Sequence, residues 1–229
     1  MRHVLIATPS YGSQVYTNYT ESLIQTCMVL SANNIQFTIK FINNQIVTRA
    51  RNMLCSIFMN DPNFTHMMFI DADISWNPPD ILKLFNHNLE CVVGIYPNKH
   101  YYWENNKLTL FPSSKYNKYE EFSNLSILNK NNNLIKIEQA ATGFMLLTKN
   151  ALKRIENDID YFYLPPSSDS KEMIKLYNYF DCNIVNHDYL TEDYYFSYLY
   201  NKNGGTIYAD KTISLTHFGP HEYGSLIKQ

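Results

Sequence analysis

The stretch HMMFIDAD, residues 66–73, decides the fold. Its first part, His66–Ile70, is an apolar run of strand length, which is typical of a strand buried on both faces of a parallel sheet. Asp71-Ala72-Asp73 follows at once. Because ligands of such sheets bind outside the carboxyl ends of the strands, these carboxylates are predicted to lie at a ligand site. Pro78-Pro79 then favours the start of a helix.

Strand and helix patterns alternate on both sides of this stretch. This alternation predicts a mainly parallel, twisted sheet with helices on both faces, in an α/β fold. The other expected elements in the first hundred residues are strands at Val4–Thr8, Ile35–Ile42 and Cys91–Ile95, and helices at Tyr16–Ala32, Ile46–Phe58 and from Pro78 through Leu84.

The second half of the chain is less regular. The polar, aromatic and Asn-rich segment Asn98–Asn133 is expected to form long loops or a small irregular excursion. No internal repeat or linker is evident, so residues 1–229 are predicted to be one domain. The remaining expected elements are strands at Leu134–Glu138 and Phe144–Leu147, helices at Lys149–Asn157 and Thr191–Tyr200, and a surface loop at Leu164–Ser170.

Composition excludes several classes of function. A formal net charge of -2 shows no basic excess for a nucleic-acid partner. The N-terminus has only the short apolar run Val4–Ala7, which is too short for a signal peptide or a transmembrane segment. None of the four cysteines falls in a CxxC pair, so the sequence has neither a zinc-site signature nor a disulfide framework. We therefore expect a soluble protein in a reducing cytoplasm, a host's cytoplasm if the source is viral, or a soluble piece of a larger assembly.

The Asp71-Ala72-Asp73 segment can bring two carboxylates to one divalent cation. Mn²⁺ and Mg²⁺ prefer carboxylate and phosphate oxygens. Such a cation would neutralise the charge of a departing nucleotide diphosphate. The alternative is that Asp71 caps a helix and Asp73 is a solvated loop residue, but the position after a buried strand favours the metal site.

Two further segments carry candidate catalytic groups. Thr191-Glu192-Asp193 opens a helix, where carboxylates are stabilised by the dipole and Thr191 is a plausible N-cap. The functional alternative makes Asp193 a general base. His217 follows the apolar run Ile213–Leu215 and either ligates the same cation or has a structural role.

Two segments near the N-terminus carry candidate ligand-binding groups. Residues 7–12, ATPSYG, follow the first strand and either hold a nucleobase, with Tyr11 stacked on it, or form an ordinary turn. Arg49 and Arg51 lie two residues apart on a helix, so only one of them should face a site. Arg49 is the residue expected to contact the donor.

Five segments, taken in order, resemble GT-A glycosyltransferases, in particular the family-2-like and Anp1-like branches with their short viral and bacterial members. They are ATPSYG at residues 7–12, RARN at 49–52, FIDADI at 69–74, ATGFML at 141–146 and TEDYYF at 191–196, followed by THFG at 216–219. The resemblance covers nearly the whole chain. It implies a single GT-A, Rossmann-like domain.

The resemblance also implies a role for each matching residue. Thr8, Pro9 and Tyr11 would bind the nucleoside, and Asp71, Ala72 and Asp73 the diphosphate. Thr142 and Gly143 would lie near the donor sugar. Asp71, Asp73 and His217 would hold Mn²⁺ or Mg²⁺, and Asp193 would be the base of an inverting transfer.

The function expected from this resemblance is transfer of a sugar from a nucleotide sugar, UDP being the commonest nucleotide, to a saccharide or glycan acceptor. Glu192 and the aromatic residues Trp103 and Tyr163 are candidates for acceptor binding. One departure matters: the Arg or Trp motif that often follows the Glu-Asp pair is absent from Phe196–Tyr200. This absence disfavours a processive synthase and leaves the stereochemistry open, so a retaining transferase stays an alternative. A non-catalytic sugar-binding or nucleotide-binding module of the same fold is a separate alternative. A nucleotidyltransferase is disfavoured, since its glycine-rich N-terminal loop is missing.

Overall fold

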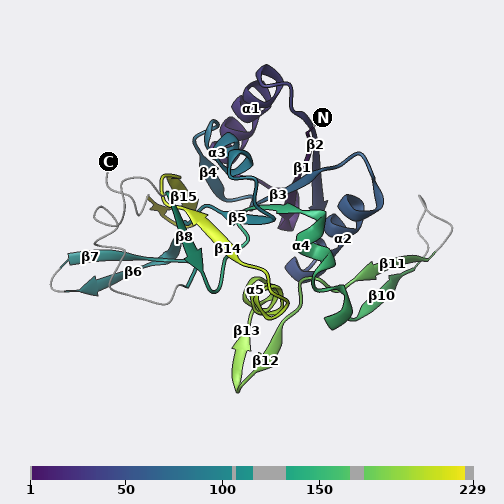
Figure 1. Ribbon diagram of the computed structural model, residues 1–229. Coiled ribbons are helices and arrows are strands. Elements are labelled where there is room, and N and C mark those ends of the chain that lie inside the picture. The colour runs from purple at the N-terminus through teal and green to yellow at the C-terminus, as the bar shows by residue number, and fades with distance from the viewer. Residues whose placement is uncertain (1, 105–106, 116–132, 166–172, 225–229) are drawn as a thin grey trace.

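A twisted sheet of seven strands forms the centre of the molecule, and helices cover both of its faces (Figure 1). The computed structural model describes residues 2–104, 107–115, 133–165 and 173–224. In sheet order the strands are β2 (Gln36–Asn43), β1 (His3–Ser10), β3 (His66–Ile70), β9 (Phe144–Thr148), β5 (Cys91–Val93), β14 (Ile207–Asp210) and β8 (Leu134–Ile137).

The strand directions confirm the predicted α/β fold. Strands β2, β1, β3, β5 and β14 run the same way, whereas β9 and β8 run against them. The sheet is therefore mainly parallel. Strand β9 lies between β3 and β5, and it pairs antiparallel with both.

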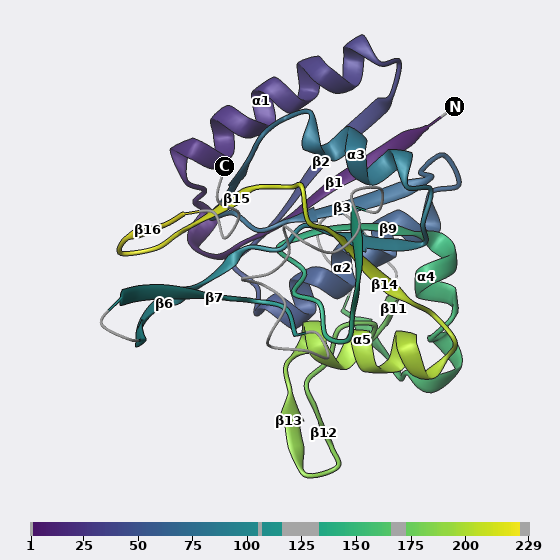
Figure 2. The same ribbon diagram turned by 60° about the vertical axis from the view of Figure 1, so that its left-hand side comes forward.

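Period-two alternation along the strands divides the core into two layers. In β1, Leu5 and Ala7 pack on one face of the sheet, and Val4 and Ile6 pack on the other. The first face is covered by α2 (Val47–Asn60), α4 (Lys149–Lys153) and α5 (Glu192–Lys202), and the second by α1 (Thr17–Ala32) and α3 (Asp80–Asn86). Figure 2 shows α1 and α5 on opposite sides of the sheet.

Parallel pairing of β1 with β3 places the ends of both strands at one edge. Val4 pairs with His66 and Ala7 with Phe69, so the last residues of β1 lie beside Asp71. The chain then turns, with Ile74 N–H donating to Asp71 O at 3.1 Å, and enters the short strand β4 (Ile74–Trp76). Strand β4 pairs with β15 (Leu215–Phe218), which also pairs with β16 (Glu222–Tyr223). Segments more than a hundred residues apart thus meet beside the aspartates.

Several elements differ from the sequence prediction. The segment expected to be loop between Asn98 and Asn133 begins with a hairpin of β6 (Pro97–Glu104) and β7 (Lys107–Pro112), because its aromatic and apolar residues are strand formers in spite of the polar composition. The helix expected at Lys149–Asn157 stops at Lys153 and is followed by a 3₁₀ turn, Glu156–Asp158. Residues 116–132 and 166–170 of the two predicted loops lie outside the described residues.

Two more hairpins were not predicted. They are β10 (Tyr161–Leu164) with β11 (Ile174–Tyr177), and β12 (Asn183–Val185) with β13 (Asp188–Leu190). Figure 2 shows the β6–β7 and β12–β13 hairpins projecting from the body of the molecule. The helices in the described part of the chain are all too short or too polar to cross a bilayer.

Candidate functional site

An open cavity of about 660 Å³ lies at the carboxyl ends of β1, β2 and β3. The end of β1, the start of α2 and the aspartate segment after β3 surround it. Its lining combines apolar and aromatic side chains with charged groups, a combination typical of ligand sites. The lining residues are Pro9, Tyr11, Gln14, Val15, Tyr16, Gln45, Ile46, Val47, Arg51, Asp71, Ala72 and Asp73.

Most residues predicted for the nucleotide lie along this cavity, but Thr8 does not. Pro9 and Tyr11 line it, and the Tyr11 ring is 84% exposed and free to stack on a ligand. Thr8 is fully buried, and its hydroxyl lies 2.6 Å from Tyr19 Oη. The Thr8 side chain thus faces the α1 layer of the core, where Tyr19 satisfies its hydroxyl, and a role for Thr8 in binding the nucleoside stays a prediction.

Arg51, rather than Arg49, enters the site. Arg49 is exposed and does not line the cavity, whereas Arg51 is only 3% exposed. Arg51 lies on the stripe of α2 that also buries Leu54 and Phe58. A charge on the apolar stripe of a helix needs buried partners, and this periodicity is the signal that would have distinguished the two arginines.

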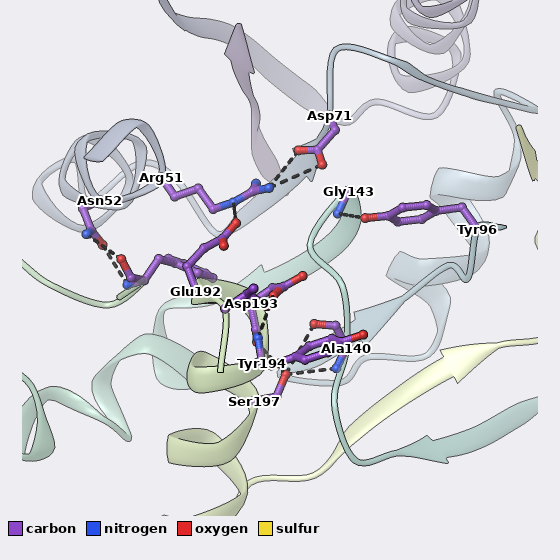
Figure 3. Close-up of polar contacts among 12 residues, drawn as sticks. Arg51, Asn52, Asp71, Tyr96, Ala140, Gly143, Glu192, Asp193, Tyr194 and Ser197 are labelled. Carbon is purple, nitrogen blue, oxygen red and sulfur yellow. Dashed lines mark hydrogen bonds and ion pairs between the residues drawn. The ribbon is translucent and has the colours of Figure 1, made fainter. Parts of the chain in front are cut away.

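The guanidinium of Arg51 joins two carboxylates from different parts of the chain (Figure 3). Its Nη2 donates to Asp71 Oδ1 at 3.0 Å, and its Nε donates to Glu192 Oε1 at 3.3 Å. Burial disfavours the charged form, but the negative charges of Asp71 and Glu192 outweigh it and raise the pKa of Arg51. The arginine therefore stays charged and ties the end of β3 to the start of α5.

Asp73 lies between two cationic or ionisable side chains. Lys99 Nζ donates to Asp73 Oδ2, and His217 Nε2 lies 3.5 Å from Asp73 Oδ1. Burial opposes ionisation of Asp73, but the contacts with His217 and Lys99 outweigh this effect and lower its pKa. The β4–β15 pairing produces this arrangement, since Phe218 N–H donates to Asp73 O at 2.8 Å.

The ring of His217 is held in one orientation. Its Nδ1 lies 2.9 Å from Pro97 O, and a carbonyl can only accept, so Nδ1 carries the proton. In the neutral imidazole the lone pair is then on Nε2, the nitrogen that faces Asp73, and the contact lowers the pKa of Asp73 only when Nε2 also carries a proton. A backbone carbonyl that fixes the tautomer in this way is the usual support of a metal-ligating histidine.

The three predicted metal ligands do not form one cluster. Among the described residues there is no group of three or more His, Cys, Asp or Glu side chains placed to hold an ion. Asp73 and His217 are adjacent, but the carboxylate of Asp71 faces Arg51 instead. Two protein ligands still fit Mn²⁺ or Mg²⁺, because these ions are commonly held by one or two side chains together with substrate phosphates.

Gly143 supports the aspartate segment from the other side. Its carbonyl accepts from Asp71 N–H at 3.0 Å, and its own N–H donates to Tyr96 Oη at 3.0 Å. A Cβ at this position would lie 2.5 Å from Tyr96 Oη, so only glycine fits. Thr142 beside it is 1% exposed, and its hydroxyl has no hydrogen-bond partner within the described residues.

The start of α5 presents the predicted base. Asp193 Oδ1 accepts from Thr191 Oγ1 at 2.5 Å and from Tyr194 N–H at 2.8 Å. Burial and the charge of Glu192 raise the pKa of Asp193 to about 6. Thr191 occupies the N-cap, but it donates to this carboxylate and makes no capping bond to the described backbone. Neither Glu192 nor Asp193 lines the cavity.

The aromatic candidates for acceptor binding lie on separate hairpins. Trp103 belongs to β6, but its side chain lies outside the described part of the structure. Tyr163 on β10 is 50% exposed and does not line the cavity. Both assignments stay predictions.

Comparisons with known proteins concern the fold. The sequence matches no protein-family model and no curated protein. The structure is similar to A197 from STIV, with 18% identity, 96% of this chain and 86% of that chain covered, and a TM-score of 0.50. It is also similar to GalNAc-T7 in its crystal structure with UDP, GalNAc and Mn²⁺, with 8% identity and a TM-score of 0.50. The chain has a GT-A-like fold.

The second similarity covers 95% of this chain but 44% of GalNAc-T7, so the present chain spans less than half of that protein's length. At these identities the likeness extends to the fold and not to individual residues. The expected Anp1-like branch stays a prediction.

Proposed function

We propose that this protein is a metal-dependent glycosyltransferase that transfers a sugar from a nucleoside diphosphate sugar, most simply a UDP-sugar, to a hydroxyl of a saccharide or glycan. The observation that carries the proposal is the juxtaposition of Asp73, which lines the cavity, and His217, whose Nε2 lies 3.5 Å from Asp73 Oδ1. The GT-A-like fold supports it, since GalNAc-T7 was crystallised with UDP, GalNAc and Mn²⁺.

The cavity has the chemistry of a nucleotide site. The exposed ring of Tyr11 and the apolar side chains of Ile46 and Val47 offer flat surfaces to a base and a ribose. Gln14 and Gln45 offer amide groups that can hydrogen-bond to them. The diphosphate would then lie toward Asp73, at the charged end of the cavity.

Asp73 and His217 are the residues that would hold the cation. The carboxylate oxygen and the Nε2 lone pair are both suitable ligands for Mn²⁺. When bound, the ion supplies positive charge to the diphosphate leaving group. In this proposal Asp71 orders the site through Arg51 and through its backbone bond to Gly143, which revises its predicted role as a ligand.

Asp193 would be the general base of an inverting transfer. Its pKa of about 6 leaves it ionised at neutral pH yet makes it a better proton acceptor than an ordinary aspartate. Glu192 is paired with the buried Arg51, whereas the bonds that Asp193 accepts from Thr191 and Tyr194 both go to Oδ1 and not to Oδ2. The acceptor hydroxyl would give its proton to Asp193 as it attacks the anomeric carbon and the bond to the diphosphate breaks.

Calorimetric titration of UDP in the presence and absence of Mn²⁺ tests this proposal. Native protein should bind UDP with Mn²⁺ at least about tenfold more tightly than without it, and Asp73→Asn should abolish the difference. Asp188→Asn, in the exposed β12–β13 hairpin, is the matched control and should behave as native.

A panel of UDP-, GDP- and TDP-sugars should then identify the donor through hydrolysis or transfer. Metal-independent UDP binding that Asp73→Asn leaves unchanged would contradict the assignment of the cation site. Saccharide binding without any hydrolysis or transfer would favour the non-catalytic module.

A further inference from the structure

Lys99 makes the closest contact with the carboxylate proposed to hold the metal. Its ammonium donates to Asp73 Oδ2, so it occupies one oxygen while His217 faces the other. The side chain of Lys99 is 33% exposed and that of Asp73 is 26% exposed, so the pair is partly shielded from water. Lys99 was not among the residues singled out from the sequence.

The aliphatic part of the Lys99 side chain lies against Gly219, which has no side chain in its way. A Cβ added to Gly219 would meet Lys99 Cδ at 3.0 Å and Cε at 3.7 Å. The same strand, β6, supplies the Pro97 carbonyl that orients His217. Lys99, Asp73 and His217 are therefore held together by the contact of β6 with β15 and by the pairing of β15 with β4.

A divalent cation and the Lys99 ammonium would share one carboxylate, with Lys99 on Oδ2 of Asp73 and the cation on Oδ1, the oxygen that faces His217. A metal bound by Asp73 and His217 would lie a few ångströms from Nζ, where two like charges repel each other. Metal binding therefore requires Lys99 to leave Asp73. Without a metal, Lys99 supplies the positive charge that Asp73 needs in a half-buried place.

Charge balance indicates where the ammonium goes. A sugar nucleotide diphosphate carries two negative charges and Asp73 one, whereas the metal supplies two positive charges. The assembled site thus has one negative charge in excess, and the displaced Lys99 ammonium is a cation beside it that can offset this charge. Lysine is a common phosphate ligand that acts as a point charge, and its flexible stem allows this shift.

We propose that Lys99 is an exchangeable counter-ion, which pairs with Asp73 in the metal-free protein and with the donor diphosphate once the metal has bound. This inference rests on the proposed function. It predicts that Lys99 opposes binding of the metal alone but favours binding of the metal together with the nucleotide. A residue with only a structural role would not act in opposite directions on these two ligands.

The test measures two affinities in Lys99→Met: that for Mn²⁺ alone, by electron paramagnetic resonance of the free ion, and that for UDP in saturating Mn²⁺, by calorimetry. The variant should bind Mn²⁺ alone about threefold to tenfold more tightly, since a partly exposed ion pair no longer has to be broken. It should bind UDP with Mn²⁺ about tenfold more weakly, because a charge-assisted phosphate contact is lost.

Two control variants separate charge from other effects. Lys99→Arg keeps the positive charge and should stay within about twofold of native for Mn²⁺ alone. Lys202→Met removes a comparable, partly exposed ion pair, Lys202 Nζ to Asp158 Oδ1 at 2.7 Å, from α5 outside the cavity and should change neither affinity. Circular dichroism melting would verify that each variant is folded.

The outcomes distinguish this inference from the proposed function. If native protein binds Mn²⁺ and UDP, and Lys99→Met has the same two affinities, the counter-ion role is wrong and the proposed function stands. A loss of both affinities in Lys99→Met would likewise overturn the counter-ion role. If native protein binds neither Mn²⁺ nor UDP, both proposals fail together.

Discussion

Arg51 donates from one nitrogen to both carboxylate oxygens of Asp71, at 3.0 and 3.4 Å, although Arg51 is almost completely buried. The remaining nitrogen, Nη1, has no hydrogen-bond partner within the described residues. The guanidinium also lies 5.3 Å from the centre of the Phe69 ring. Arg51 thus links its own helix, α2, to the end of β3 through Asp71 and to the start of α5 through Glu192.

Replacing Arg51 should destabilise the protein strongly. Arg51→Met leaves Asp71 and Glu192 as partly buried negative charges without a partner, and breaking a buried pair in this way costs about 3–5 kcal/mol. Urea unfolding of the native protein and the variant at pH 7.5 measures the loss.

Arg154→Met is the control for Arg51. Arg154 pairs with Glu90, but its side chain is 40% exposed, and ion pairs at the surface contribute little to stability. Equal losses for the two variants would mean that the Arg51 network is no more important than a surface ion pair.

Asp193→Asn should lose transfer while it keeps donor affinity. Removing a general base typically lowers the rate by about 10²–10⁴-fold. The amide can still accept from Thr191 and from Tyr194 N–H, so the variant should be at least as stable as native at pH 7.5. Glu192→Gln should lower the turnover rate less than Asp193→Asn does. Near-native turnover of Asp193→Asn, or a product that retains the donor's anomeric configuration, would contradict the base assignment.

The rate should also depend on pH in a defined direction. Burial raises the pKa of Asp193 to about 6, so the carboxyl is protonated and inactive as a base below that pH. The value of kcat/KM should therefore fall tenfold per pH unit below about pH 6 and level off above it. A profile that stays flat from pH 5 to pH 8 would show that another group acts as the base.

The two nitrogens of His217 can be tested separately. His217→Asn retains a donor for the Pro97 carbonyl but has no atom at the Nε2 position, and it should weaken Mn²⁺ binding by about tenfold or more. His217→Gln can place an oxygen near the Nε2 position and should retain more of the affinity. Equal Mn²⁺ affinity for native protein and both variants would remove His217 from the site.

Gly143→Ala should disturb the aspartate segment through packing. The added Cβ would lie 2.5 Å from Tyr96 Oη and 2.6 Å from its Cζ, and Tyr96 is buried. Overpacking of this kind costs about 1–3 kcal/mol. Gly224→Ala, where a Cβ meets no atom of the described residues within 4 Å, should leave the melting temperature unchanged. Equal melting temperatures for the two variants would show that Tyr96 moves away from the added Cβ with no measurable loss of stability.

Sequence periodicity was informative wherever local order decided the outcome. The apolar run of β3 predicted a central buried strand, because only a strand covered on both faces tolerates such a run. The carboxylates directly after it had to lie at the strand's carboxyl end, whatever the rest of the fold. Where aromatic residues were interspersed with many asparagines, as in the β6–β7 hairpin, composition obscured the strand pattern and the prediction failed.

Local sequence patterns were enough to predict the alternating α/β order, the position of Asp71 and Asp73 after β3, and the rule that only one of Arg49 and Arg51 enters a site. Tertiary structure decided which arginine that is, since α2 turns the Arg51 stripe toward the sheet. It also decided that Asp71 faces Arg51 while Asp73 faces Lys99 and His217. The pairing of β4 with β15 joins residues that are 144 positions apart in the chain, from Asp73 to His217 (217 minus 73). Local propensity cannot specify such a contact, because it forms only when the two layers of the core have packed and the strand edges have met.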